Sequence, residues 1–267
     1  RYYRIDFGSK FHYSTLEKLN YDDNLYLTSH PSLEQFSLLI PHAKLVWDNT
    51  SPAFPFPING ARFYLQYQLS TIQLKFQKLT FDYRKYYKLF NGVSFAGRTF
   101  LGTAWGKNKQ NFFLGGLRWI ASSVNQRYPD NIDAIGIKDI YYSEVVMPMR
   151  GSYISQLRGY NVGLLNLELR LPFLLYYFPA IKFFGQINGV FFVDIGTSWS
   201  DSFTTFFNSS SWENTDAQPS QWLMSYGYGP RFWLLGLPWK LDFAWQYNPY
   251  KGTISKKEWY LSIGFDY

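Results

Sequence analysis

Apolar and polar residues alternate along several stretches of the chain, most regularly at its C-terminal end. Every second residue of this last stretch is apolar: Trp259, Leu261, Ile263, Phe265 and Tyr267. The same period of two recurs within 62–69, 165–171, 225–232 and 241–248. Successive side chains of a β-strand point to opposite faces, so the pattern predicts strands with one apolar and one polar face.

About eleven strands are predicted in this way, with turn residues between them. They cover residues 1–14, 36–48, 61–69, 78–90, 93–105, 111–116, 163–173, 183–196, 222–235, 239–248 and 257–267. The long polar stretches 117–149 and 200–220 predict loops, whereas 249–256 predicts a short turn. Long loops at one end of the strands and short turns at the other are typical of outer-membrane barrels.

The best apolar run, residues 171–181, is too short for a membrane helix and contains Pro172 and Pro179. A spanning helix needs about 20 mainly apolar residues. Aromatic residues nevertheless make up 22% of the chain, while the mean hydropathy is only −0.24. Alternating strands with aromatic girdles at both membrane interfaces have this composition. The sequence therefore predicts an all-β fold, a transmembrane antiparallel β-barrel.

A single barrel domain is predicted over residues 1–267, because no linker, internal repeat or soluble domain is evident. Single-chain bacterial barrels usually have an even number of strands. Two explanations of the odd count stay open: a further strand within 137–146, or N-terminal strands that lie outside this sequence. The chain begins with Arg1 rather than Met, which favours the second explanation. We therefore expect the barrel to lack its N-terminal strands.

Four motifs follow one another in a fixed order. They are Phe-Phe-Leu-Gly-Gly at 112–116, Met-Pro-Met-Arg-Gly at 147–151, Leu-Asn-Leu-Glu-Leu-Arg-Leu-Pro-Phe at 165–173, and Val-Phe-Phe-Val-Asp-Ile-Gly-Thr-Ser-Trp at 190–199. In this order and spacing they resemble the barrel of the BamA/TamA superfamily of outer-membrane assembly and translocation proteins. The resemblance covers most of the chain and implies the C-terminal part of a barrel of about 16 strands.

In that family, the loop with the Arg-Gly motif folds back into the barrel lumen. The resemblance implies such a loop over 117–162, with Arg150, Gly151 and Tyr153 at the motif. Ser152 departs from the family pattern, which usually has an aromatic residue directly after the Arg-Gly pair. A second triplet therefore stays in reserve: Arg158, Gly159 and Tyr160.

The resemblance also implies partners for this arginine on the barrel wall: Glu168, Asp194 and the adjoining Gly196. Alternation independently places Glu168 and Asp194 on the polar faces of their strands. The planar fork of an arginine can engage two carboxylates, and a lumen shielded from water strengthens such pairs. We expect an Arg150–Asp194 contact inside the barrel, either as a structural pin or with an active role.

The last strand resembles the signal that the outer-membrane assembly machinery recognises, since it alternates regularly and ends in the aromatic Tyr267. In the family this strand pairs weakly with the first strand. An unpaired edge at 259–267 could template a client strand by β-augmentation. A fully paired, static seam is the alternative, and the sequence leaves both open.

Neither an enzyme, a cofactor nor a metal site is expected. The chain has no cysteine, and its three histidines, His12, His30 and His42, lack metal-ligand spacing. Its net charge of +7 could suit nucleic acid. We expect no nucleic-acid partner, however, because the basic residues gather in loops and turns, where they can meet lipid phosphates.

The resemblance implies a protein of the bacterial outer membrane that inserts or translocates other proteins. Its expected partners are outer-membrane lipid, other envelope proteins and unfolded outer-membrane clients. Three alternatives stay open: an accessory or structural barrel subunit of a larger complex, a passive pore, and the barrel tail of an outer-membrane enzyme such as a lipase fusion.

Overall fold

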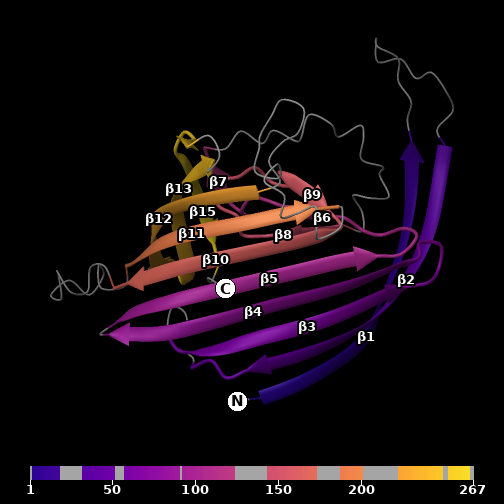
Figure 1. The fold of residues 1–267 in the computed structure, drawn as a ribbon, viewed down its shortest axis with the longest axis horizontal. Helices are drawn as coiled ribbons and strands as arrows, with labels where there is room; N and C mark the ends of the chain where they lie inside the picture. The colour runs from indigo at the N-terminus through magenta and orange to yellow at the C-terminus, as the bar shows by residue number, and fades with distance from the viewer. Residues whose placement is uncertain are drawn as a thin grey trace, which may run out of the picture.

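A computed structural model describes residues 2–18, 32–51, 57–90, 92–123, 143–172, 187–200, 222–248 and 252–264. One curved antiparallel sheet dominates these residues (Figure 1). Its strands follow the order β1 (Tyr2–Lys18), β2 (Ser32–Asp48), β3 (Gly60–Ser70), β4 (Phe76–Phe90), β5 (Val93–Trp105), β10 (Asn161–Leu171), β11 (Asn188–Trp199), β12 (Trp222–Leu234), β13 (Leu237–Asn248), β15 (Glu258–Ile263) and β7 (Ala121–Ser122), with β14 (Thr253–Ile254) beside β13. The predicted all-β antiparallel fold is confirmed.

The alternation of the sequence becomes the two faces of this sheet. On β10, the inner side chains of Asn166 and Glu168 are buried, while the outer Leu167 and Leu169 are more exposed. The outer face of β11, β12 and β13 is aromatic, and the ring of Tyr228 lies 6.3 Å from Phe191 and 5.4 Å from Phe243. Such cross-strand pairs stabilise the register, and this apolar outer face suits contact with lipid chains.

A second, small sheet lies on the concave side of the large one (Figure 1). It consists of β6 (Phe112–Leu114), β8 (Glu144–Val146) and β9 (Leu157–Gly159). All three strands belong to the connection between β5 and β10, residues 106–160, which we call the lumen loop. Its apolar residues pack against inner residues of β5, β10 and β12 in one buried cluster: Phe112, Leu114, Val146 and Met149 with Phe100, Ala104, Val162, Leu164 and Leu223.

Two strand predictions need correction. The stretch 111–116 was expected to be a barrel-wall strand, but β6 spans three residues and pairs with β8 and β9 inside the curve. The segment 137–146 does contain β8, yet β8 runs parallel to β6 and adds no strand to the wall. All three residues of β6 are buried, so it shows no alternation between two faces. Apolar runs of this kind do not reveal in the sequence which surface they cover.

The connections differ in length at the two ends of the wall. Leu235 and Gly236, both with positive φ, join β12 to β13, whereas the lumen loop leaves the opposite end. The predicted loop 200–220 lies almost entirely outside the described residues. Among the described strands, β1 and β15 do not pair with each other, so the sheet is an open segment of a barrel. No helix in the described part of the chain is long and apolar enough to cross a membrane.

Candidate functional site

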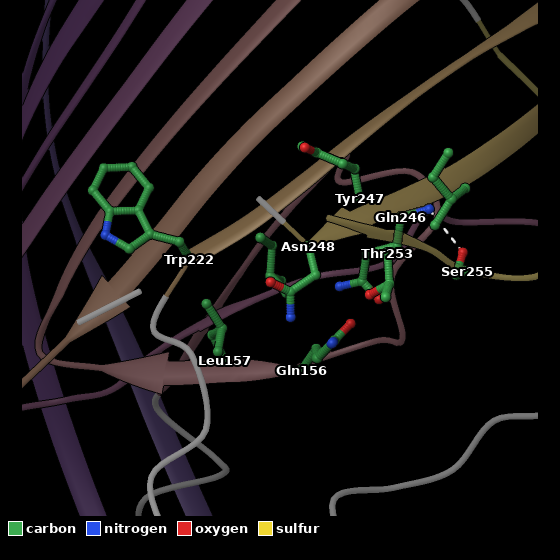
Figure 2. Close-up of a pocket in the computed structure, with 10 residues that line it drawn as sticks. Gln156, Leu157, Trp222, Gln246, Tyr247, Asn248, Thr253 and Ser255 are labelled. Carbon is green, nitrogen blue, oxygen red and sulfur yellow. Dashed lines mark hydrogen bonds between the residues drawn. The ribbon is translucent and has the colours of Figure 1, made fainter. Parts of the chain in front are cut away.

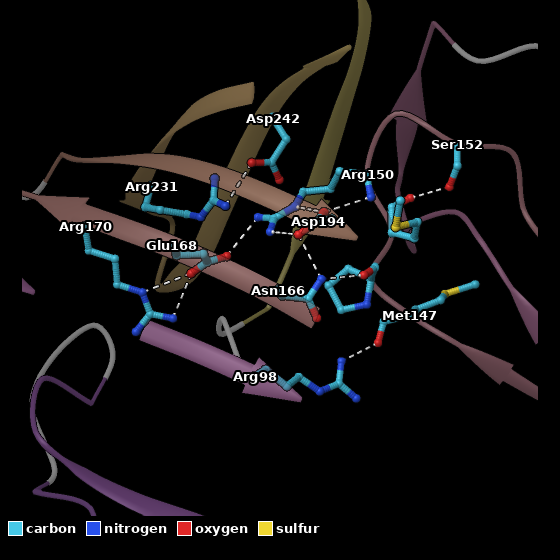
Figure 3. Close-up of polar contacts among 12 residues, drawn as sticks. Arg98, Met147, Arg150, Ser152, Asn166, Glu168, Arg170, Asp194, Arg231 and Asp242 are labelled. Carbon is cyan, nitrogen blue, oxygen red and sulfur yellow. Dashed lines mark hydrogen bonds and ion pairs between the residues drawn. The ribbon is translucent and has the colours of Figure 1, made fainter. Parts of the chain in front are cut away.

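Arg150 lies in a turn of the lumen loop, and its guanidinium meets the inner face of β10 and β11 (Figure 3). Nε and Nη2 donate to the two carboxylate oxygens of Asp194 at 2.8 and 2.7 Å. Nη1 donates to Oε1 of Glu168 at 2.8 Å. The guanidinium carbon also lies 3.7 Å from the centre of the Phe192 ring. The side chain of Arg150 is only 2% exposed, so the whole contact is shielded from water.

Asn166 is a further member of this site, and the sequence did not single it out as one. It lies directly opposite Asp194 in the pairing of β10 with β11. Its side-chain amide donates to Oδ1 of Asp194 at 2.8 Å and to the carbonyl of Pro148 at 2.9 Å. Asn166 therefore links the wall directly to the turn that carries Arg150. Asn166 stands two residues before Glu168 and therefore lies on the same polar face of the strand. This spacing is the signal in the sequence that could have identified Asn166 as a member of the site.

Two further arginines complete the network. Arg170, two residues after Glu168, donates to Oε2 of Glu168 at 2.9 and 3.0 Å. Arg98 on β5 donates to the carbonyl of Met147 at 2.6 Å and to Asp82 at 2.8 and 3.0 Å. The lumen loop is thus held from β5 as well as from β10 and β11. Sequence reasoning missed Arg98 because its distance from Met147 along the chain gives no local signal.

Because Arg150, Glu168 and Asp194 are buried, breaking their ion pairs would destabilise the fold strongly. Removing one partner of a buried, hydrogen-bonded ion pair costs about 3–5 kcal/mol, because it leaves the other charge without compensation. Arg150 compensates two carboxylates, each 0% exposed. The cluster can therefore fix the loop strongly against the wall. Among the described residues, no three His, Asp or Glu side chains are grouped to hold a metal ion.

The residues that follow Arg150 attach the lumen loop to β12 and β15. Gly151 has a φ of +74°, and its N–H donates to the Tyr260 hydroxyl of β15 at 3.0 Å. A Cβ at Gly151 would lie 3.2 Å from the side chain of Ser225, so glycine suits the close approach as well as the backbone. Ser152 accepts from the N–H of Gly116 and donates to the carbonyl of Met149. Tyr153 is 40% exposed.

The structure does not bring the reserve triplet to the wall carboxylates. Arg158 is exposed on β9. Gly159 faces the backbone of Trp199, where a Cβ would lie only 2.5 Å away. The ring of Tyr160 lies under Lys109, 4.1 Å from its ammonium group. Of the three residues, only Gly159 lies where β9 packs beside β11.

Gly196 contributes to packing rather than to the polar network. A Cβ there would lie 2.7 Å from Leu114 of β6. The glycine leaves room on β11 for the small sheet. A larger residue at position 196 would collide with the small sheet, so this position of the inner surface requires glycine.

The predicted last-strand residues divide between described and undescribed positions. Trp259, Leu261 and Ile263 lie on β15, which pairs with β13 on one edge and with β7 of the lumen loop on the other. Phe265 and Tyr267 lie outside the described residues. Where the family resemblance implied the first strand as neighbour, the described neighbour is therefore a segment of the lumen loop.

Two hollows adjoin the lumen loop. One of about 310 Å³ lies beside Arg150, and its lining is strongly basic: Arg84, Arg98, Arg118, Arg150, Arg231 and Lys240 face it, with Asp242 as the one carboxylate among the described lining residues. The other, of about 280 Å³, lies between β9, β12 and β13 (Figure 2). Its described lining carries no charge, and the backbone N–H of Gln246 donates there to Ser255 at 2.8 Å.

An antiparallel wall with an apolar outer face, and an inward loop held by an arginine–carboxylate cluster, define the class: a transmembrane β-barrel with its loop packed inside. The chain belongs to the Omp85 superfamily, since the sequence profile of the Omp85 superfamily domain matches residues 1–267. This is a family of outer-membrane barrels for protein insertion or translocation, without an enzymatic reaction. The resemblance inferred from the four motifs is confirmed.

Among solved structures, BamA from Haemophilus ducreyi lacking POTRA domains 1–3 is similar, with a TM-score of 0.59 and 14% sequence identity. The match covers 98% of this chain and 51% of that one, so the chain spans about half the length of its structural relative. At this identity the likeness shows the fold alone, a BamA-type barrel. The comparison with curated proteins found no match.

Proposed function

We propose that this protein resides in the bacterial outer membrane and inserts other proteins into that membrane or moves them across it. The supporting observations are the membership of the Omp85 superfamily, the apolar outer face and the buried anchoring of the lumen loop. The observation that carries the proposal is the contact of Arg150 with both Asp194 and Glu168. Unfolded outer-membrane proteins and other envelope proteins are the proposed partners.

The proposed mechanism is non-covalent. The Arg150 cluster ties the lumen loop to β10 and β11, while the N–H of Gly151 ties the same turn to Tyr260 of β15. The loop therefore connects the middle of the wall to its last strand. A strand edge at β15 could accept an incoming strand through main-chain hydrogen bonds. In this proposal residues 117–162 act as a lumen element of a single barrel domain.

The test uses the full-length protein in lipid vesicles, to which a urea-unfolded outer-membrane protein is added. We expect vesicles with the protein to fold this client faster than empty vesicles, measured by protease protection. Arg150→Ala should remove most of the acceleration, because the buried Asp194 loses its bidentate arginine and the lumen loop loses its ion pairs to the wall. Arg158→Ala, an exposed arginine of the same loop, should leave it unchanged. Equal rates with wild-type and empty vesicles would exclude the function.

A second candidate function has one observation in its favour. The second edge of β15 is paired with β7 rather than open, as in a static seam. A barrel with a permanently closed edge would suit an accessory or structural subunit of a larger envelope complex. Stable co-purification with a fixed set of envelope proteins, without any acceleration of client folding, would support this candidate.

A further inference from the structure

Two pairs of like-charged residues lie directly opposite each other on the inner face of the wall. Arg84 of β4 lies opposite Arg98 of β5. Arg231 of β12 lies opposite Lys240 of β13. Like charges in directly opposite positions destabilise a sheet. All four side chains line the hollow of about 310 Å³ beside Arg150, and Figure 3 shows Arg98 and Arg231 of this lining. Both pairs therefore face one space from two separate parts of the wall.

Carboxylates compensate these charges only in part. Asp82 accepts hydrogen bonds from Arg84 at 2.8 and 3.0 Å and from Arg98 at 2.8 and 3.0 Å. One carboxylate thus serves two guanidinium groups. At the other pair, Asp242 forms an ion pair with Arg231 at 2.8 Å, and it is the one carboxylate in the described lining of the hollow. Each pair of cations therefore shares its side of the hollow with one described carboxylate, which leaves an excess positive charge on each side.

The lumen loop brings a further positive charge to the hollow. Arg118, between β6 and β7, lines it, is exposed, and forms no ion pair within the described part of the chain. Arg150 lies at the same hollow, but Asp194 and Glu168 already balance its charge. The excess positive charge at the hollow therefore comes from the two opposed pairs and from Arg118.

Guanidinium groups predominate in this lining, and their planar fork of donors matches the oxygens of a phosphate group. A phosphate monoester carries about −1.5 to −2 charges at pH 7 and three acceptor oxygens. Arg98 and Arg231 are only 7% and 4% exposed, so their donors are already held in place and binding costs little ordering. The volume of the hollow is at the lower end of the range of small-molecule sites, ~300–1,000 Å³. Charge, donor geometry and size together favour a small phosphorylated group.

We propose that this hollow binds a phosphate group, held by Arg84, Arg98, Arg118, Arg231 and Lys240. The group belongs either to a small soluble phosphate ester that enters the lumen or to the headgroup of a phosphorylated lipid. A bound dianion would relieve the repulsion within both cation pairs and would join β4 and β5 to β12 and β13. Phosphate would therefore stabilise the folded barrel with its lumen loop in place.

The test uses the full-length protein in a neutral detergent, because this chain spans about half of its structural relative. Inorganic phosphate is the probe, and sodium chloride of equal ionic strength is the reference. We expect the phosphorus NMR resonance of phosphate to broaden saturably when protein is added. The urea midpoint of unfolding should rise as well, since a ligand of the folded state stabilises that state. Succinate, a dianion whose ends carry two acceptor oxygens instead of three, should raise the midpoint less.

Arg118→Ala removes one cation of the hollow without breaking an ion pair among the described residues. We expect about tenfold weaker phosphate binding, the effect of one lost charge-assisted hydrogen bond, with an unchanged urea midpoint in chloride. Lys240→Gln is a second variant, which should weaken binding by a similar factor. Arg158→Ala is the matched control, since Arg158 is an exposed arginine of the same loop outside the described lining of the hollow.

Lipid vesicles distinguish the two sources of the phosphate group. The protein is placed in phosphatidylcholine vesicles that contain either phosphatidic acid, a phosphomonoester lipid, or phosphatidylglycerol, an anionic phosphodiester lipid. If phosphatidic acid weakens the binding of inorganic phosphate more than phosphatidylglycerol does, the hollow takes a lipid headgroup. Equal binding in both kinds of vesicle assigns the hollow to a soluble phosphate ester.

Two results would overturn the phosphate site. One is the absence of saturable phosphate binding by the wild-type protein, and the other is wild-type affinity in both Arg118→Ala and Lys240→Gln. Stabilisation by succinate equal to that by phosphate would exclude phosphate as the class of ligand. None of these results depends on the acceleration of client folding, so the phosphate site and the proposed insertion function are tested separately.

Discussion

Arg150 and Asp194 meet side-on, with two side-chain hydrogen bonds of 2.8 and 2.7 Å, and the backbone N–H of Arg150 donates to the same carboxylate at 3.1 Å. One carboxylate of β11 therefore fixes both the side chain and the backbone of the turn in the lumen loop. Charge-assisted bidentate pairs of this kind combine strength with a defined orientation. The position of the loop inside the wall follows from this geometry.

Arg150→Lys should destabilise the folded barrel although the charge is kept. A lysine cannot present the planar fork that reaches Asp194 and Glu168 together. We expect a loss of about 2–4 kcal/mol in the free energy of unfolding, measured by urea titration in detergent or lipid. Arg158→Lys is the matched control and should change stability by less than about 0.5 kcal/mol, since Arg158 is exposed. Equal stability of the two variants would contradict the anchoring role.

Tyr260→Phe tests the contact between the loop and the last strand. The substitution removes the hydroxyl that accepts from the N–H of Gly151 and leaves a buried donor without its partner. Such a donor costs about 1–3 kcal/mol. Tyr228→Phe removes a hydroxyl from the more exposed outer face and should be nearly neutral. Hydrogen exchange at Gly151 should also become faster in the first variant, and unchanged exchange there would argue against the contact.

Gly159→Ala should disturb the packing of the small sheet on the wall. A Cβ at this position would lie 2.5 Å from backbone atoms of Trp199, which cannot move aside as a side chain tip can. Overpacking of this kind costs about 1–3 kcal/mol. Gly163→Ala is the control, because its Cβ would meet side chains at an ordinary 3.6 Å. If both variants unfold at the same urea concentration, β9 does not lie against β11 as described.

Leu167→Arg tests whether the outer face of β10 meets lipid. An arginine on the lipid face near the middle of a bilayer costs about 2–4 kcal/mol. We expect lower folding yields in lipid vesicles and a smaller effect in detergent micelles, which adapt around the charge. Leu235→Arg makes the same substitution in the turn between β12 and β13, where the leucine is 86% exposed, and should fold normally. Normal yields for Leu167→Arg would place this face away from lipid.

Much of the wall could be predicted, because alternation is a local property. The predicted stretches 61–69, 93–105 and 239–248 differ from β3, β5 and β13 by at most two residues at either end. The short strand β6 was assigned to the wall, since an apolar run of three buried residues does not reveal which surface it covers. The arginine network was only partly predictable, because Asn166 and Arg98 reach the loop through tertiary contacts.

The sequence by itself determined which face of each strand a residue occupies, since the backbone of a strand points neighbouring side chains in opposite directions. The inward direction of Glu168 and Asp194 follows from that local rule. Only the tertiary structure decided which arginine meets them and which segment lies beside β15. Arg150 and Asp194 are 44 residues apart, and Ser123 and Trp259 are 136 apart. Contacts over such separations depend on the path of the whole chain and on strand register, which the local alternation does not contain.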